Sequence, residues 1–155
     1  MKEILMLIFD IVNFGLLVLL WGFTVKNYTH LPGTIPVHFD FDGKADGFGS
    51  KKYAFLLPAM AILLYILLAF AVRDPDAANY PVEITASNRE NQFLIMETFL
   101  RWFCTLIMLI FLNNQDYVFR YSADHSVKPK VPMATAFLTI IASLVASFVL
   151  VGIFK

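Results

Sequence analysis

Four long, mainly apolar stretches constrain the fold of this 155-residue chain more than any other feature. They lie at residues 4–25, 53–72, 93–112 and 134–154. Each is close to the ~20 residues that a helix needs to cross the hydrocarbon core of a bilayer. Hydrophobic residues make up 59% of the sequence, so too little polar sequence remains for a separate soluble domain. The sequence therefore predicts an all-α integral membrane protein, with four transmembrane helices in a single membrane domain over residues 1–155.

The connections between these helices determine which segments share a side of the membrane. They comprise residues 26–52, 73–92 and 113–133. An even number of spans places both termini and the second connection on one side, and the first and third connections on the other. The first stretch is longer than the apolar part of a secretory signal and shows no small-residue cleavage pattern, so we expect a retained helix.

Charged residues occur inside two of the predicted helices. Asp10 and Asn13 are three positions apart and Glu97 and Arg101 are four apart, so each pair shares a helical face. A charge at the bilayer centre costs about 2.5–3.5 kcal/mol on insertion scales, which favours pairing and burial against protein. At a rise of ~1.5 Å per residue, Asp10 and Arg101 lie about 9 and 12 Å deep from the same face. We therefore expect these four residues to form one intramembrane polar cluster.

Two interpretations of this cluster stay open. It forms a buried ion pair that determines helix order, or it serves a small ion-coupled transporter that uses Asp10, Glu97 and Arg101. The last apolar stretch carries small polar residues at every fourth position, which predicts a face packed against protein and, as the alternative, a polar transport path. These residues are Thr135, Thr139, Ser143 and Ser147.

The first connection, residues 26–52, has a carboxylate-rich appearance that suggests a metal site. In the register of a calcium-binding EF-hand loop, however, Lys44 and Lys51 fall on ligand positions and Ala45 replaces the turn glycine. No tight histidine or cysteine spacing favours a transition metal. We therefore predict no metal and no cofactor. A metal-dependent membrane enzyme remains the alternative, and its candidate residues are His38, Asp40, Asp42 and Asp46.

The same connection has the pattern of a β-hairpin. Apolar side chains alternate with polar ones at Val37, Phe39 and Phe41. Asp42-Gly43 then predicts a two-residue turn. We expect a short β-ribbon on the membrane surface with its aromatic side chains facing inward. Gly47 and Gly49 are expected to allow a tight or positive-φ backbone before the next helix.

The order of residues in this connection resembles a known family. Leu31-Pro-Gly-Thr-Ile-Pro-Val-His-Phe-Asp, followed by Gly43 and by Asp46-Gly-Phe-Gly-Ser-Lys51, resembles the signature of the domain of unknown function 1648. This domain occurs in bacterial membrane proteins that include toxin-immunity proteins of the SdpI type. The resemblance covers the first two predicted helices and their connection. It carries over the signature residues Pro36, His38, Asp40, Gly43, Asp46, Gly47, Gly49, Ser50 and Lys51.

The resemblance implies a non-enzymatic, multi-pass protein of the cytoplasmic (inner) membrane. We expect it to recognise a ligand or toxin through residues 31–52, in immunity or signalling. The expected partners are the lipid bilayer, a peptide toxin or other small ligand, and a second copy or a partner membrane protein. No basic cluster indicates nucleic acid. An enzyme would need a nucleophile and a base, for which His38 and Ser50 are the nearby pair.

Two signals disagree about which side of the membrane carries the first connection. Seven of the 12 lysine and arginine residues lie on the side of the first and third connections, which favours a cytoplasmic first connection. Relatives are rich in arginine near the start of the third helix, which instead favours an external first connection. We expect the signature residues to face outside.

Overall fold

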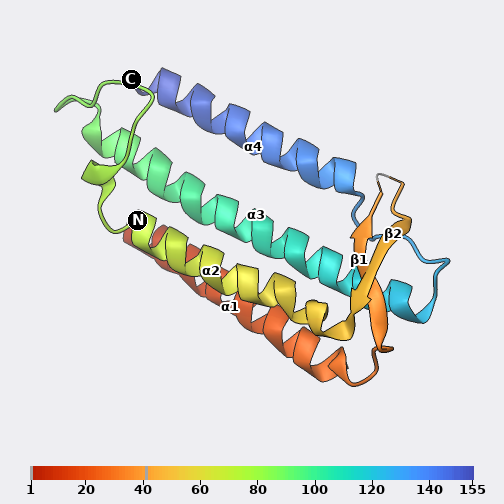
Figure 1. The fold of residues 1–155 in the computed structure, drawn as a ribbon. Helices are drawn as coiled ribbons and strands as arrows, with labels where there is room; N and C mark the ends of the chain where they lie inside the picture. Colours follow the sequence, from red (N-terminus) through yellow and green to blue (C-terminus); the bar gives the residue numbers. More distant parts are fainter. Residues whose placement is uncertain (1, 41) are drawn as a thin grey trace.

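A computed structural model describes residues 2–40 and 42–155 and contains four long helices and one β-hairpin (Figure 1). The helices are α1 (Lys2–Tyr28), α2 (Leu56–Ala71), α3 (Arg89–Ala123) and α4 (Met133–Ile153). The hairpin consists of β1 (Thr34–Phe39) and β2 (Ala45–Ser50), and the short 3-10 helices are η1 (Lys51–Phe55) and η2 (Pro75–Ala77). With η1 continuing into α2, all four helices are long and apolar enough to cross a membrane. The predicted fold, four transmembrane helices with a ribbon between the first two, is confirmed.

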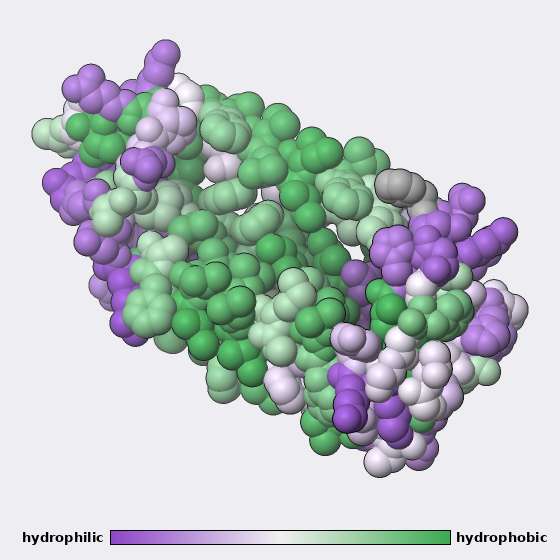
Figure 2. Space-filling model, in the orientation of Figure 1, coloured by the Kyte–Doolittle hydropathy of each residue, from purple (hydrophilic) through white to green (hydrophobic). Residues whose placement is uncertain are grey.

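Both termini lie at one end of the helices and the hairpin lies at the other (Figure 1). The connection between α3 and α4 shares the hairpin end. The surface between the two ends is predominantly apolar, whereas polar residues gather at both ends (Figure 2). This distribution is typical of a protein that spans a bilayer.

Helix α3 is longer than the sequence pattern predicted. It continues from residue 112 to Ala123, so the third connection is only residues 124–132. The polar run that indicated a loop finds partners within the fold. The Asn113 side chain accepts a hydrogen bond from the Val131 amide at 3.0 Å, and Asp116 pairs with Arg120 one turn later at 2.8 Å. A pair within the helix and a contact with the segment before α4 therefore stabilise this polar segment as a helix.

The core lies where α1, α2 and α3 meet. Its fully buried members are Leu17, Leu20, Ala61, Cys104 and Met108. Helix α4 is different, because among the described residues it contributes no fully buried side chain. It packs against α3 and against no other helix to a comparable extent.

The small polar stripe predicted on α4 is only half correct. The half-buried positions of α4 are Ala136, Ile140, Ser143, Ser147 and Val151. Trp102 of α3 donates a hydrogen bond to Ser143 at 3.1 Å. Thr135 and Thr139 are exposed instead. The reason is geometric: four residues of an α-helix turn through about 400°, so a strict every-fourth row drifts about 40° per step off any one face.

The loop of the hairpin is one residue longer than predicted. Asp40 donates its amide to the Lys44 carbonyl at 2.9 Å, and Gly43 donates its amide to the Asp40 carbonyl at 3.0 Å. Three residues therefore connect Asp40 to Lys44, in place of the predicted two-residue turn at Asp42-Gly43. Gly43 has φ 80°, which glycine adopts without steric cost and which this class of longer turn requires. Phe41 lies outside the described residues.

Two bulges change which hairpin residues face the helices. The register pairs Pro36 with Phe48, His38 with Gly47, and Phe39 with Ala45. Val37 in β1 and Asp46 in β2 are thus extra residues without a partner in the ladder. Val37, which alternation placed on the same face as Phe39, is 46% exposed, whereas Pro36 is buried. Phe39 faces inward as predicted and packs against α3.

Candidate functional site

The end of α3 holds the hairpin turn in place. The ring of Phe39 packs against Tyr117 and Tyr121, with centroids 4.6 and 5.4 Å away. The Tyr117 hydroxyl donates a hydrogen bond to the Gly43 carbonyl, and the Ala45 amide donates to the Tyr121 hydroxyl at 3.4 Å. The segment of α3 that the sequence pattern missed is therefore the platform for the turn.

Several signature residues hold the hairpin and its junction with α2 together. The Asp40 carboxylate accepts the Lys44 amide at 2.8 Å and closes the turn. At the other end of β2, the Ser50 hydroxyl accepts the Lys52 amide at 3.4 Å and caps η1. The Lys51 ammonium lies 4.9 Å from the centroid of the Tyr28 ring. These roles are structural and leave few polar groups free for a ligand.

Gly47 and Gly49 are required for close packing and not for an unusual backbone. Among the described residues, Gly43 alone adopts a positive φ, so of the two alternatives expected for the strand glycines, a tight or a positive-φ backbone, the positive φ was wrong. A Cβ at Gly47 would lie 3.0 Å from the Cβ of His38. A Cβ at Gly49 would lie 3.0 Å from the Tyr53 ring. The absence of a side chain at both glycines therefore lets His38 and Tyr53 pack directly against the backbone of β2.

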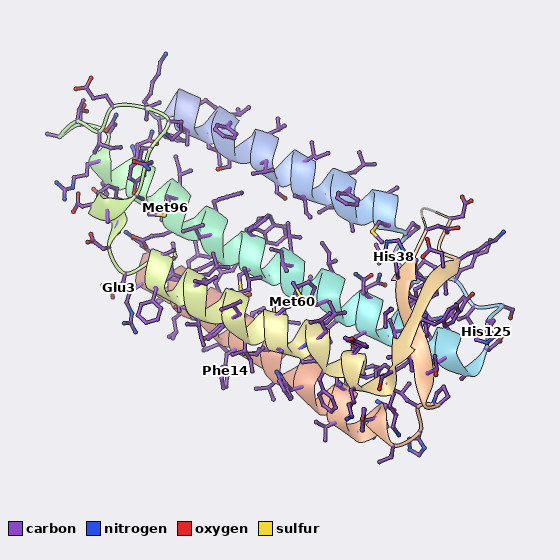
Figure 3. The ribbon with its side chains drawn as sticks, in the orientation of Figure 1. Glu3, Phe14, His38, Met60, Met96 and His125 are labelled. Carbon is purple, nitrogen blue, oxygen red and sulfur yellow. The ribbon has the colours of Figure 1, made fainter. Side chains whose placement is uncertain are left out.

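His38 and Asp46 form an exposed ion pair on the hairpin. His38 Nδ1 contacts the Asp46 carboxylate, and the two side chains are 72% and 48% exposed. Asp46 is the extra residue of the β2 bulge and is adjacent to Gly47, which pairs with His38 in the register. Figure 3 shows His38 on the side of the hairpin that faces the start of α4. These two signature residues point away from the hairpin core and are available to a ligand.

A cavity of about 430 Å³ lies under this side of the hairpin. It is enclosed by β1 and the turn, the start of α2, the end of α3 and the segment that precedes α4. Its apolar walls include Leu56, Leu57, Val131 and Met133, and its polar lining includes His38, Asp40, Asp42, Asn114 and Lys128. Apolar walls with a few polar groups, at a volume of roughly 300–1,000 Å³, are typical of ligand sites.

The carboxylates of this region do not gather into a metal site. Among the described residues, no three His, Cys, Asp or Glu side chains lie close enough to hold a metal ion. The Asp40 carboxylate is engaged by a backbone amide, and Asp46 pairs with His38. Ser50 lies opposite Thr34 in the register, four residues from His38 along β1 and so roughly 13 Å away at ~3.3 Å per residue. The candidate pair of His38 and Ser50 is therefore not brought together.

The structure brings the four intramembrane polar residues together. The Arg101 guanidinium donates to the two Asp10 carboxylate oxygens at 2.9 and 3.5 Å, and it lies 3.8 Å from Glu97. The Asn13 side-chain amide donates to the Arg101 carbonyl at 3.1 Å. Sequence reasoning missed Lys2, which pairs with Glu97 at 3.2 Å. Beside the cluster lies a second cavity of about 200 Å³, lined in part by Tyr65 and Cys104.

A second buried polar group lies deeper along α3, near the hairpin. Gln115, which is 1% exposed, donates to the Thr24 hydroxyl at 2.9 Å and to the Ala54 carbonyl at 2.7 Å. Between this group and the Asp10 cluster, fully buried Leu20 and Met108 close the interface of α1 and α3. A transported ion would have to cross this apolar layer.

Comparison with known proteins matches the hairpin region to a family. Residues 15–62, from the middle of α1 to the first turns of α2, match the family model described as Domain of unknown function (DUF1648). The chain carries a DUF1648 domain. An uncharacterized protein of Archaeoglobus fulgidus is 38% identical over 77 residues, which cover 44% of this chain. They cover 42% of the archaeal protein, so the chain matches less than half of that relative's length. No solved structure matches the chain.

The DUF1648 domain supplies only part of the cavity. Its hairpin and the start of α2 form the roof and one wall. The other walls, at Tyr117 on α3 and at Met133 at the start of α4, lie outside residues 15–62. Asp10, Glu97 and Arg101 lie outside as well. The cavity is therefore a product of the domain together with the two helices that follow it.

Proposed function

We propose that this multi-pass membrane protein is a non-enzymatic recognition protein, whose DUF1648 hairpin binds an amphipathic, membrane-active ligand in the cavity beneath it. The observation that carries the proposal is the cavity itself. Its apolar walls continue the apolar surface of the helices, while its polar lining comes from the hairpin, the end of α3 and the segment before α4. A ligand with one apolar and one polar end fits such an environment, because each end meets a surface of its own polarity.

The exposed pair of His38 and Asp46 supports the same function. Most signature residues build the hairpin, whereas the side chains of this pair are exposed and His38 also lines the cavity. The resemblance to toxin-immunity proteins makes a peptide toxin one candidate ligand, and a lipid-like molecule is the other. In the proposal, ligand binding protects the membrane or signals the presence of the ligand. The location in the cytoplasmic membrane, with the hairpin facing outside, is part of the proposal.

The test compares cells that produce the natural chain with cells that produce a His38→Ala, Asp46→Ala variant. Both are challenged with membrane-active peptides and detergents, and the amount of protein in the membrane is measured in parallel. We expect the variant to lose protection at an unchanged protein level. Gly33→Ala serves as the matched hairpin control, since a Cβ at Gly33 would meet nothing within 4 Å. Equal tolerance of the variant and the natural chain would exclude recognition through this pair.

A further inference from the structure

We infer that the occupant of the hairpin cavity is a zwitterionic, lipid-like amphiphile that enters sideways from the bilayer, between α2 and α4. The inference rests on the proposed function and narrows its ligand to one chemical class.

The gap between α2 and α4 follows from the helix packing. Among the described residues, α4 packs against α3 but has no comparable contact with α2 (Figure 1). The space-filling view shows hollows in the apolar surface beside α4 (Figure 2). On α3, Leu109 is 47% exposed although this helix packs against the other three. We interpret these hollows as an apolar groove beside α3, between α2 and α4.

The groove and the cavity meet at the hairpin end. Leu56 and Leu57 begin α2, Met133 begins α4, and all three line the cavity. Leu56 is 54% exposed, so the wall on the α2 side is open toward the membrane. In a bilayer, water does not fill an apolar groove at this depth, and hydrocarbon chains do. An acyl chain in the groove would place its head group directly under the hairpin.

The charges at the cavity select the head group. Asp42 on the hairpin turn and Lys128 before α4 both line the cavity. Within residues 2–40 and 42–155, neither side chain takes part in an ion pair. The other charged lining residues are engaged, His38 with Asp46 and the Asp40 carboxylate with the Lys44 amide. One free anion and one free cation therefore face the same space from different segments.

A zwitterion complements this arrangement better than a simple ion. The Lys128 ammonium would attract a phosphate group. The carboxylates of Asp40 and Asp42 would repel the same phosphate if it carried no positive group. An ammonium group linked to the phosphate would pair with Asp42 and offset that repulsion. A lone cation would be attracted by the two carboxylates, but it would leave Lys128 without a partner. The geometry points to a head group of the phosphoethanolamine type on one or two acyl chains.

The test is native mass spectrometry of the purified full chain, after incubation with defined lipids in detergent. The probes are phosphatidylethanolamine, phosphatidylglycerol and water-soluble phosphoethanolamine. We expect phosphatidylethanolamine to be retained about tenfold better than phosphatidylglycerol, which is the value of roughly one charge-assisted hydrogen bond. Free phosphoethanolamine is expected not to be retained, because it lacks the chain that fills the groove.

Three variants test the site. Asp42→Asn is expected to remove the preference between the two lipids, and Lys128→Gln to weaken retention of both about tenfold. Leu57→Trp, which narrows the wall at α2, is expected to reduce retention of the lipids. Lys26→Gln, in the last turn of α1 and outside the cavity lining, is the matched control and should change nothing.

The outcomes separate this inference from the proposed function. Equal retention of the two lipids, or retention that Asp42→Asn and Lys128→Gln leave unchanged, overturns the inference. If protection in cells still depends on His38 and Asp46 in that case, the proposed function stands and the ligand is a peptide. Binding of free phosphoethanolamine as strongly as of the lipid would overturn the sideways route through the groove.

Discussion

The pairing of Asp10 with Arg101 makes a quantitative prediction about the stability of the helix bundle. The guanidinium bonds both carboxylate oxygens, and its side chain is only 13% exposed, whereas that of Asp10 is 50% exposed. Charged hydrogen bonds contribute about 1.5–3 kcal/mol each, but partial exposure of Asp10 reduces the total. We expect a coupling free energy of about 1.5–2 kcal/mol between the two residues.

The single variants should differ in cost. Arg101→Gln leaves Asp10 and Glu97 without their shared cation, so we expect a loss of about 3 kcal/mol in the free energy of unfolding. Asp10→Asn leaves Arg101 with Glu97 and should cost only about 1.5 kcal/mol. The double variant should cost less than the sum of the two. Reversible unfolding in mixed detergent micelles, followed by tryptophan fluorescence, measures all four proteins of the double-mutant cycle.

The pair of Asp76 and Arg89 is the matched control for this cycle. It joins the same two residue types at 2.5 Å, but its side chains are 60% and 55% exposed. Pairs of this exposure are worth about 0.2–1 kcal/mol. If the coupling between Asp10 and Arg101 is no larger than that of the control pair, burial inside the membrane does not strengthen the cluster, and the reasoning is refuted.

Two further predictions concern the hairpin. Tyr117→Phe removes the hydroxyl that donates to the Gly43 carbonyl, at a cost of about 1 kcal/mol in the stability of the turn. Hydrogen exchange of the turn amides should therefore become several-fold faster. Unchanged exchange would contradict the anchoring role of Tyr117. Gly47→Ala brings a Cβ to 3.0 Å from His38 and should destabilise the hairpin by about 1–3 kcal/mol, whereas Gly33→Ala, with open space around it, should be nearly neutral in the same thermal unfolding assay.

The length of the apolar stretches and the depth of their charges were enough to predict much of the fold. Asp10 and Arg101 were expected at similar depths from one face, and the structure joins them at 2.9 Å. This inference worked because a bilayer aligns helix ends, so a position along the sequence becomes a position along the membrane normal. The same logic placed the two termini together and the hairpin at the opposite end.

The end of α3 and the bulges of the hairpin were not predictable by the same reasoning. The polar run from residue 113 onward indicated a loop by composition, yet Tyr117 and Tyr121, one turn apart, continue the helix and pack against Phe39. A helical spacing of these two aromatic residues was the signal available in the sequence. The bulges left no such signal, since alternation of apolar and polar residues predicts a regular ladder.

The sequence by itself determined that the chain spans a membrane, how many times it does so, and which polar residues must find partners there. These follow from transfer free energies, which depend on composition and length alone. Only the tertiary structure decided that the hairpin lies across the end of α3, that α4 stays apart from α2, and that a cavity opens between them. Those features depend on side-chain packing between distant segments, which no local pattern encodes.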